Sequence, residues 1–128
     1  MRFFVKGIPT KRRVRFTKSG KAYVDAKTKA EMKEIASKYR GEKIRGCVSV
    51  EVDVYPKLPK NTPKKITSLP AMKKPDLDNV LKVVMDALEG VAYDNDAQVT
   101  KTRAERHDMQ RIEWDYIIVT VNPIYRSR

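Results

Sequence analysis

The sequence predicts a small α/β domain of the α+β kind, in which a mixed sheet of about four strands packs against two main helices. A chain of 128 residues with 41% hydrophobic content has enough apolar material for one modest core. Between residues 48 and 55, four valines alternate with other residues, which is the pattern of a strand with one buried face. Between residues 77 and 88, apolar residues recur at the spacing of an amphipathic helix. We therefore treat residues 1–128 as a single domain.

The N-terminal half has the order strand, helix, strand. Apolar residues at 3–8 predict a short strand that ends at Pro9. Residues 26–39 predict a helix with one apolar face, which Gly41 ends. The valine-rich strand at 48–55 follows. This order fits an α/β layer, and an antiparallel arrangement of the strands is also allowed.

Two further strands are expected after the second helix, at 98–105 and 111–122, joined by a turn at His107-Asp108. Apolar residues occupy both faces of the last strand, so we place it in the centre of the sheet. Trp114 is assigned to the core. His107 is the only histidine of the chain, and we assign it to an exposed turn without a role in function.

The composition is strongly basic, with 28 Lys and Arg against 16 Asp and Glu and a formal net charge of +12. Such an excess is typical of proteins that bind nucleic acid, although ribosomal proteins and proteins of anionic membranes share it. A single cysteine, Cys47, excludes an intramolecular disulfide and a cysteine-built zinc site. No segment has the length and apolar character of a membrane span or a signal peptide, so we expect a cytoplasmic protein.

Two stretches concentrate basic residues without any acidic residue. Residues 11–21 carry six of them, which suits an arm that contacts phosphates, although a solvated basic loop explains the composition equally well. Residues 56–75 hold five of the seven prolines and six lysines, so we expect a long loop that forms a flap over the acidic residues after it. The candidate nucleic-acid-binding residues are Lys11, Arg12, Arg13, Arg15, Lys18, Lys21, Lys57, Lys60, Lys64, Lys65, Lys73 and Lys74.

Acidic residues line one flank of the helix expected at 77–88. Asp78, Lys82 and Asp86 follow one another at four-residue spacing, which places them in a row along that flank. Asp76 precedes the helix at the position of an N-cap.

A second acidic cluster, at 94–96, follows the expected end of the helix at Gly90. If it folds back on the helix, three or four carboxylates converge beside Lys82 in a basic protein, which suggests a metal ion held against a polyanion. The alternative is structural. In that case Asp76 and Asp78 cap the helix, Lys82 is an ordinary i+4 partner of Asp78, and the second cluster is a turn.

These residues resemble the signature of the RusA family of Holliday-junction resolvases. The resemblance is specific between residues 76 and 99, where the motifs are Asp76-Leu77-Asp78-Asn79, Lys82, Asp86-Ala87-Leu88 and Asp96-Ala97-Gln98-Val99. A weaker resemblance to phage-type members lies in Gly7-x-Pro9-x-Lys11-x-Arg13-x-Arg15 and Gly20-x-x-Tyr23. The C-terminal strands agree with the family only in pattern.

The resemblance implies a small α/β homodimer, in a bacterial or phage-infected cell, that cuts four-way DNA junctions with Mg²⁺ and uses no small-molecule cofactor. Mn²⁺ is an alternative ion. By the same resemblance, Asp76, Asp78 and Asp96 bind the metal, and Lys82 completes the catalytic set. Two departures matter. Asn95 stands where relatives often have an acidic residue, and the asparagine-rich N-terminal motif of the enterobacterial branch is absent, so no cut-site preference carries over.

The chemistry of phosphodiester hydrolysis agrees with these residue types. Mg²⁺ prefers one or two protein carboxylates and keeps waters and phosphate oxygens as its other ligands, while a nearby ammonium group stabilises developing negative charge. Two alternatives stay open. One is a non-catalytic nucleic-acid-binding dimer, in which the aspartates only cap and solubilise. The other is a metal-dependent nuclease that acts on other DNA structures.

Overall fold

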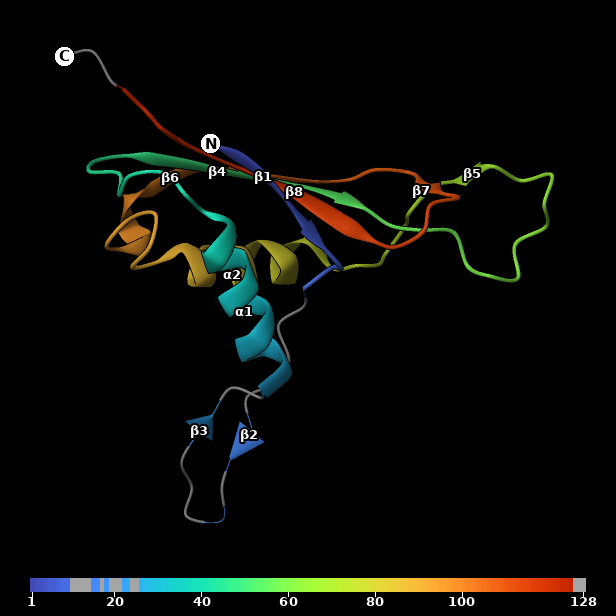
Figure 1. The fold of residues 1–128 in the computed structure, drawn as a ribbon, viewed down its shortest axis with the longest axis horizontal. Coiled ribbons are helices and arrows are strands. Elements are labelled where there is room, and N and C mark those ends of the chain that lie inside the picture. Colours follow the sequence, from blue (N-terminus) through green and yellow to red (C-terminus); the bar gives the residue numbers. More distant parts are fainter. Residues whose placement is uncertain (10–14, 17, 19–21, 24–25, 126–128) are drawn as a thin grey trace.

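A four-stranded mixed sheet forms one layer of the protein, and two helices form the other (Figure 1). In the computed structural model, which describes residues 1–9, 15–16, 18, 22–23 and 26–125, the strand order is β1-β8-β4-β6. The strands are β1 (Arg2–Lys6), β4 (Val48–Tyr55), β6 (Val99–Arg106) and β8 (Tyr116–Pro123). The helices are α1 (Ala26–Lys38) and α2 (Leu77–Leu88). The predicted α+β class, with its sheet of four strands and two helices, is confirmed.

Strand β8 lies in the centre of the sheet, as its apolar pattern predicts. It pairs antiparallel with β1 on one side and with β4 on the other, and β4 pairs parallel with β6. The predicted turn between the last two strands is wrong, because β4 separates β6 from β8. Their connection is longer than a turn and contains β7 (Met109–Gln110), and β8 begins only at Tyr116.

The core lies between the sheet and the two helices. The four valines of β4 are fully buried, and the inward residues of β8 are at most 1% exposed. The buried residues of α2 are Val80, Val83, Val84, Ala87 and Leu88. Leu81 and Met85 belong to the predicted apolar stripe but are only partly buried. The buried face of α2 therefore shares Val80, Val84 and Leu88 with that stripe and extends to Val83 and Ala87, while Leu81 and Met85 lie at its border.

Two residue assignments in the C-terminal region are wrong. Trp114 is 39% exposed, and the Nζ atom of Lys6 lies 4.4 Å from its ring centroid. Trp114 precedes β8, so it lies outside the strand whose alternate residues enter the core. His107 is half-buried, with its Nε2 2.9 Å from Oδ1 of Asp53 and its ring stacked on Tyr55 at 4.3 Å between centroids. The parallel pairing of β4 and β6 brings these partners to it.

The Pro/Lys-rich segment 56–75 folds back on the connection between β6 and β8. Within it, β5 (Ser68–Leu69) pairs antiparallel with β7. Arg111, which follows β7, donates hydrogen bonds to two backbone carbonyls of the segment over 3.0 and 2.7 Å. These elements form an arm that projects from the main sheet at the right of Figure 1.

A short antiparallel pair, β2 (Arg15–Phe16) with β3 (Ala22–Tyr23), belongs to the basic stretch before α1. Lys18 is exposed, and only the backbone of Arg15 is described. The candidate phosphate-binding residues that lie outside the described residues are Lys11, Arg12, Arg13 and Lys21. Neither of the described helices combines the length and the apolar character needed to cross a bilayer.

Candidate metal and nucleic-acid site

Asp76 begins α2 as its N-cap. Its Oδ1 accepts hydrogen bonds from the N–H groups of Asp78 and Asn79 over 3.0 and 3.3 Å. The turn before it is fixed by Arg106 at the end of β6, whose Nη1 donates to the carbonyl of Pro75 over 3.2 Å. Asp76 therefore has a structural role, which engages one of its two carboxylate oxygens.

A hollow of about 260 Å³ on the flank of α2, which we call the acidic hollow, brings together three of the four predicted catalytic residues. Its lining is Asp78, Leu81, Lys82, Met85, Asp86 and Asp96. Asp96 belongs to η1 (Asp96–Gln98), the 3₁₀ turn that precedes β6. Of the described residues, neither Asp76 nor any member of 56–75 lines the hollow, so the structure does not place the predicted flap over it.

Gln98 holds η1 in place. Its Oε1 accepts hydrogen bonds from the N–H groups of Asp94 and Asn95, and its Nε2 donates to two backbone carbonyls of the segment that leads into β4. Asn95 Oδ1 in turn accepts from the N–H of Ala97 over 2.8 Å, which completes a capping box. Asn95, the departure from the family pattern, therefore acts as a helix cap and fixes the position of the aspartate that follows it.

Tyr93 joins α2 to the turn before η1. Its side chain is fully buried, and its hydroxyl donates to the carbonyl of Met85 over 2.7 Å. Burial raises the pKa of Tyr93 far above its ordinary value, and the negative charges of Glu89, Asp86 and Asp96 raise it further. Two of these charges line the acidic hollow, so the hollow is an electronegative site in a chain of net charge +12.

We expect the raised pKa of Tyr93 to make the fold sensitive to alkali. Below the ordinary value of about 10, the phenol is protonated in the folded and the unfolded chain alike. Above it, only the unfolded chain releases the proton, so the free energy of unfolding falls as the pH rises. The variant Tyr93→Phe has no phenol at this position, so its free energy of unfolding should lack the part of the decline that Tyr93 causes. Urea denaturation between about pH 8 and pH 11 measures it.

The control for this measurement is Tyr125→Phe, because Tyr125 is 90% exposed. It should keep the alkaline decline of the wild-type chain. If Tyr93→Phe keeps the full decline as well, the phenol of Tyr93 does not contribute to it.

The donors around the acidic hollow fit a hard divalent cation. Mg²⁺ prefers carboxylate oxygens, uses one or two of them and keeps several waters. Asp78 and Asp96 supply that number from two separate elements, α2 and η1. With the neighbouring aspartates Asp76 and Asp86 they do not form a compact group of three or more ligands. Among the described residues, the groups whose ligand atoms all lie within 4.8 Å of one another are those of Asp53, Glu105 and His107.

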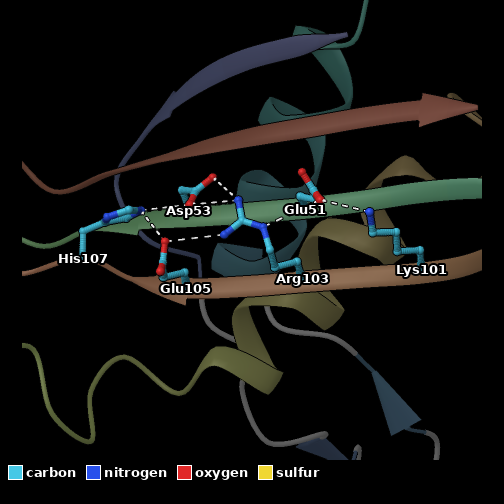
Figure 2. Close-up of polar contacts among 6 residues, drawn as sticks. All are labelled: Glu51, Asp53, Lys101, Arg103, Glu105 and His107. Atoms are coloured by element: carbon cyan, nitrogen blue, oxygen red, sulfur yellow. Dashed lines mark hydrogen bonds and ion pairs between the residues drawn. The ribbon is translucent and has the colours of Figure 1, made fainter.

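These three residues belong to an ion-pair network that sequence reasoning missed (Figure 2). The guanidinium of Arg103 bonds to both oxygens of the buried Asp53, over 3.2 and 3.0 Å, and lies 3.5 Å from Glu105. His107 Nε2 lies 2.9 Å from Asp53 and 3.3 Å from Glu105. The charge of Asp53 is the main cause that raises the pKa of Arg103. Because Arg103 already neutralises Asp53, we assign the network to charge pairing and not to a metal.

The lysines of segment 56–75 differ in their exposure. Lys60, Lys64, Lys65, Lys73 and Lys74 are exposed. Lys57 is half-buried, with its N–H bonded to Oδ1 of Asp115 over 2.8 Å and its Nζ 3.5 Å from the carbonyl of Glu113. Lys57 therefore ties the segment to the chain before β8, and the five exposed lysines are the candidates for phosphate contact.

Most of the chain matches a known protein family. The model of that family, described as Endodeoxyribonuclease RusA, matches residues 6–119, which include α2, η1 and the whole acidic hollow. The chain belongs to the RusA family. The resemblance inferred from the sequence is thereby confirmed, and the family match covers Asp76, Asp78, Lys82 and Asp96 alike.

This RusA-family chain is similar to the Uncharacterized protein YqaN of Bacillus subtilis (strain 168). The two are 38% identical over 81 residues, which make up 56% of this chain and 57% of that protein. The chain thus spans just over half of the length of this relative.

Proposed function

We propose that this RusA-family protein is a Mg²⁺-dependent endodeoxyribonuclease that resolves four-way DNA junctions by paired nicks in a bacterial or phage-infected cell. The observation that carries the proposal is the acidic hollow, where Asp78, Lys82, Asp86 and Asp96 meet in a strongly basic chain. Carboxylates that face a polyanion repel it. A protein that only binds DNA has no use for them, whereas a metal-dependent nuclease needs them.

Three aspartates and one lysine have roles in this proposal. Asp78 and Asp96 would hold the metal ion, and Asp76, which lies outside the lining of the hollow, would join them through the carboxylate oxygen that does not cap α2. When bound there, Mg²⁺ or Mn²⁺ would supply an activated water and would stabilise charge on the leaving oxygen. Lys82 lies one helical turn after Asp78, where its ammonium group stabilises negative charge on the phosphate under attack.

Resolution of a four-way junction requires two nicks related by the two-fold symmetry of the junction. The described part of each chain has one acidic hollow, which supplies one cutting centre. Closed two-fold dimers are the commonest way to duplicate a site with this symmetry. We therefore include a homodimer in the proposal, with both hollows on the same side and facing basic surface.

A non-catalytic DNA-binding dimer is the second candidate, and the cap made by Asp76 favours it. The third is a metal-dependent nuclease of other DNA structures. One experiment separates them, in which a labelled four-way junction, linear duplex and single strand are each incubated with Mg²⁺, Mn²⁺ or a chelator. Metal-dependent paired nicks in the junction alone support the proposal. Binding without cleavage supports the second candidate, and equal cleavage of all substrates supports the third.

The exposed lysines of segment 56–75 should make DNA binding depend steeply on salt. Each phosphate contact contributes about −0.9 to the slope of log K against log salt on duplex DNA. Replacement of Lys60, Lys64 and Lys65 by Ala is therefore expected to flatten the slope by up to about 2.7 per chain. Fluorescence anisotropy of a labelled junction, in chelator and over a series of salt concentrations, measures this slope.

The matched control replaces three exposed lysines of α1, Lys27, Lys29 and Lys33, which lie outside the segment. It should leave the slope close to that of the wild-type chain. A slope that is unchanged in the segment variant would make 56–75 a spacer and not a phosphate-binding surface.

A further inference from the structure

Segment 56–75 leaves the main sheet at the end of β4 and leads into α2. It begins directly after Tyr55, the last residue of β4, and ends directly before Asp76, the N-cap of α2. Strands β4 and β6 are parallel, so both end at the same edge of the sheet, and Val54 lies opposite Arg106 there. The end of β6 therefore lies beside the point where the segment departs.

His107, the first residue after β6, holds the beginning of the segment. Its backbone N–H donates to the carbonyl of Val54 over 2.9 Å. Its ring stacks on that of Tyr55, with the two planes parallel and the centroids 4.3 Å apart. Its Nε2 lies 2.9 Å from Oδ1 of the buried Asp53, and Figure 2 shows the imidazole directed toward Asp53 and Glu105. The residues at the end of β4, from which the segment departs, are thus each in contact with His107.

Arg106, the last residue of β6, holds the end of the segment. Its side chain is half-buried, and its Nη1 donates to the carbonyl of Pro75 over 3.2 Å. Pro75 is followed by Asp76, whose Oδ1 accepts from the N–H groups of Asp78 and Asn79. Within the described part of the chain, no acidic side chain forms an ion pair with Arg106. Contact with the backbone, and not charge pairing, therefore fixes the position of its guanidinium.

The turn that Arg106 holds has a strained backbone. Lys73 has a φ of 71°, in the left-handed region that residues other than glycine seldom adopt. Across this turn, the N–H of Lys74 donates to the carbonyl of Met72 over 2.9 Å. A strained conformation persists only where surrounding contacts hold it, and it is common at ligand-binding sites. Among the described residues, the bond from Arg106 is the hydrogen bond that joins this turn to the main sheet.

We propose that Arg106 and His107, which we call the clasp, are positioning residues for the reaction. Adjacent in the sequence, they fix the two ends of segment 56–75 to one strand of the sheet. DNA phosphates that contact the lysines of the segment then lie at a fixed place relative to Asp76 and Asp78. The inference rests on the proposed function, which assigns the segment to DNA and the two aspartates to the metal. Neither residue of the clasp touches substrate in this role.

Positioning of this kind has a large effect on a reaction rate. Displacement of a reacting group by about 1 Å is enough to lower the rate about 10²-fold. A long segment that is attached at one end only has many accessible positions, whereas attachment of both ends to the same strand leaves few. The clasp therefore removes conformational freedom from the segment before DNA binds.

Amide hydrogen exchange, followed by NMR, tests the Arg106 half of the clasp. Arg106→Met removes the donor to Pro75, so exchange of the N–H groups of Asp78 and Asn79 should become about two- to tenfold faster. Arg106→Lys keeps the charge and a donor and should restore most of the protection. Arg45→Met is the matched control, because Arg45 is exposed, precedes β4 and has no ion-pair partner among the described residues. It should leave both amides unchanged.

The His107 half is tested on amides within the arm. The N–H of Gln110 donates to the carbonyl of Pro56 over 3.2 Å, and the N–H of Leu58 donates to the carbonyl of Gln110 over 2.8 Å. His107→Ala should make these two amides exchange about two- to tenfold faster and leave the two that Arg106 protects near their wild-type rates. A general loss of stability would instead raise exchange throughout the chain. Circular dichroism checks that each variant folds, and each half has its own variant.

Junction DNA should act on α2 through the clasp. In chelator, a saturating four-way junction should slow exchange of the Asp78 and Asn79 amides in the wild-type chain, and Arg106→Met should abolish this slowing. With Mg²⁺, both Arg106→Met and His107→Ala should lower kcat for junction cleavage about 10- to 100-fold and change KM little. Arg106→Lys should recover most of kcat.

Three results would overturn the proposal: amides that stay unchanged in either variant, exchange that rises equally throughout the chain, or a wild-type kcat in both variants. Cleavage and exchange are scored separately. If the wild-type chain cuts no junction, the proposed function fails. The clasp then stands if junction binding still slows exchange in the wild-type chain but not in Arg106→Met, and it falls if the two chains respond alike.

Discussion

Asp78→Asn and Asp96→Asn are each expected to lower the rate of junction cleavage by at least about 10³-fold, because charge stabilisation by a bound metal is worth several kcal/mol. Junction binding should stay as tight as in the wild-type chain or become tighter, since a negative charge that faces phosphate is removed. Both quantities are measured on the same labelled four-way junction, cleavage with excess Mg²⁺ and binding with a chelator.

Asp94→Asn is the matched control for these variants. It makes the same change of charge two residues before Asp96, but Asp94 pairs with Lys43 over 2.9 Å and does not line the acidic hollow. Its cleavage rate should equal that of the wild-type chain. A triple variant in which Asp76, Asp78 and Asp96 are all Asn, and which still cuts with Mg²⁺, would show that the metal site is elsewhere.

Lys82→Met should lower kcat for junction cleavage by about 10²- to 10³-fold and change KM little, because the ammonium group acts on charge that develops during the reaction. Methionine keeps most of the length of the side chain, so the lining of the acidic hollow is disturbed less than by alanine. Single-turnover cleavage with saturating enzyme separates the chemical step from binding.

Lys33→Met on α1 removes one positive charge from an exposed position outside the acidic hollow, so it serves as the control for Lys82. An equal loss of activity in both variants would mean that Lys82 contributes only to the net charge that attracts DNA. A loss that disappears as the substrate concentration rises would assign Lys82 to binding and not to the chemical step.

Local patterns were sufficient to predict the two helices and the four strands of the main sheet. The valine alternation gives the bounds of β4 correctly, and the predicted helix at 26–39 differs from α1 by one residue. The four-residue spacing along α2 also predicts the row of Asp78, Lys82 and Asp86 in the acidic hollow. These features depend on helical and strand periodicity, which can be recognised from residues that are close together in the sequence.

The features that were missed depend on contacts between distant segments. His107 is held by Asp53, 54 residues before it, only because β4 and β6 are parallel neighbours. Trp114 has the composition of a core residue, but its place before β8 leaves it exposed. The burial of Val83 and Ala87 on α2, with Leu81 left at the border, depends on the sheet against which the helix packs. No short window of sequence contains these relationships.

The parallel pairing of β4 with β6 has a consequence for how this protein diversifies. Parallel neighbours need a crossover connection, and here the crossover contains both α2 and η1. Every side chain of the acidic hollow therefore comes from one continuous stretch, 78–96. In the proposed function, the residues that act on the phosphate and the lysines that contact DNA therefore occupy separate parts of the gene. Under that proposal, an insertion in segment 56–75 is expected to alter which DNA is held and to leave the stretch 78–96 unchanged.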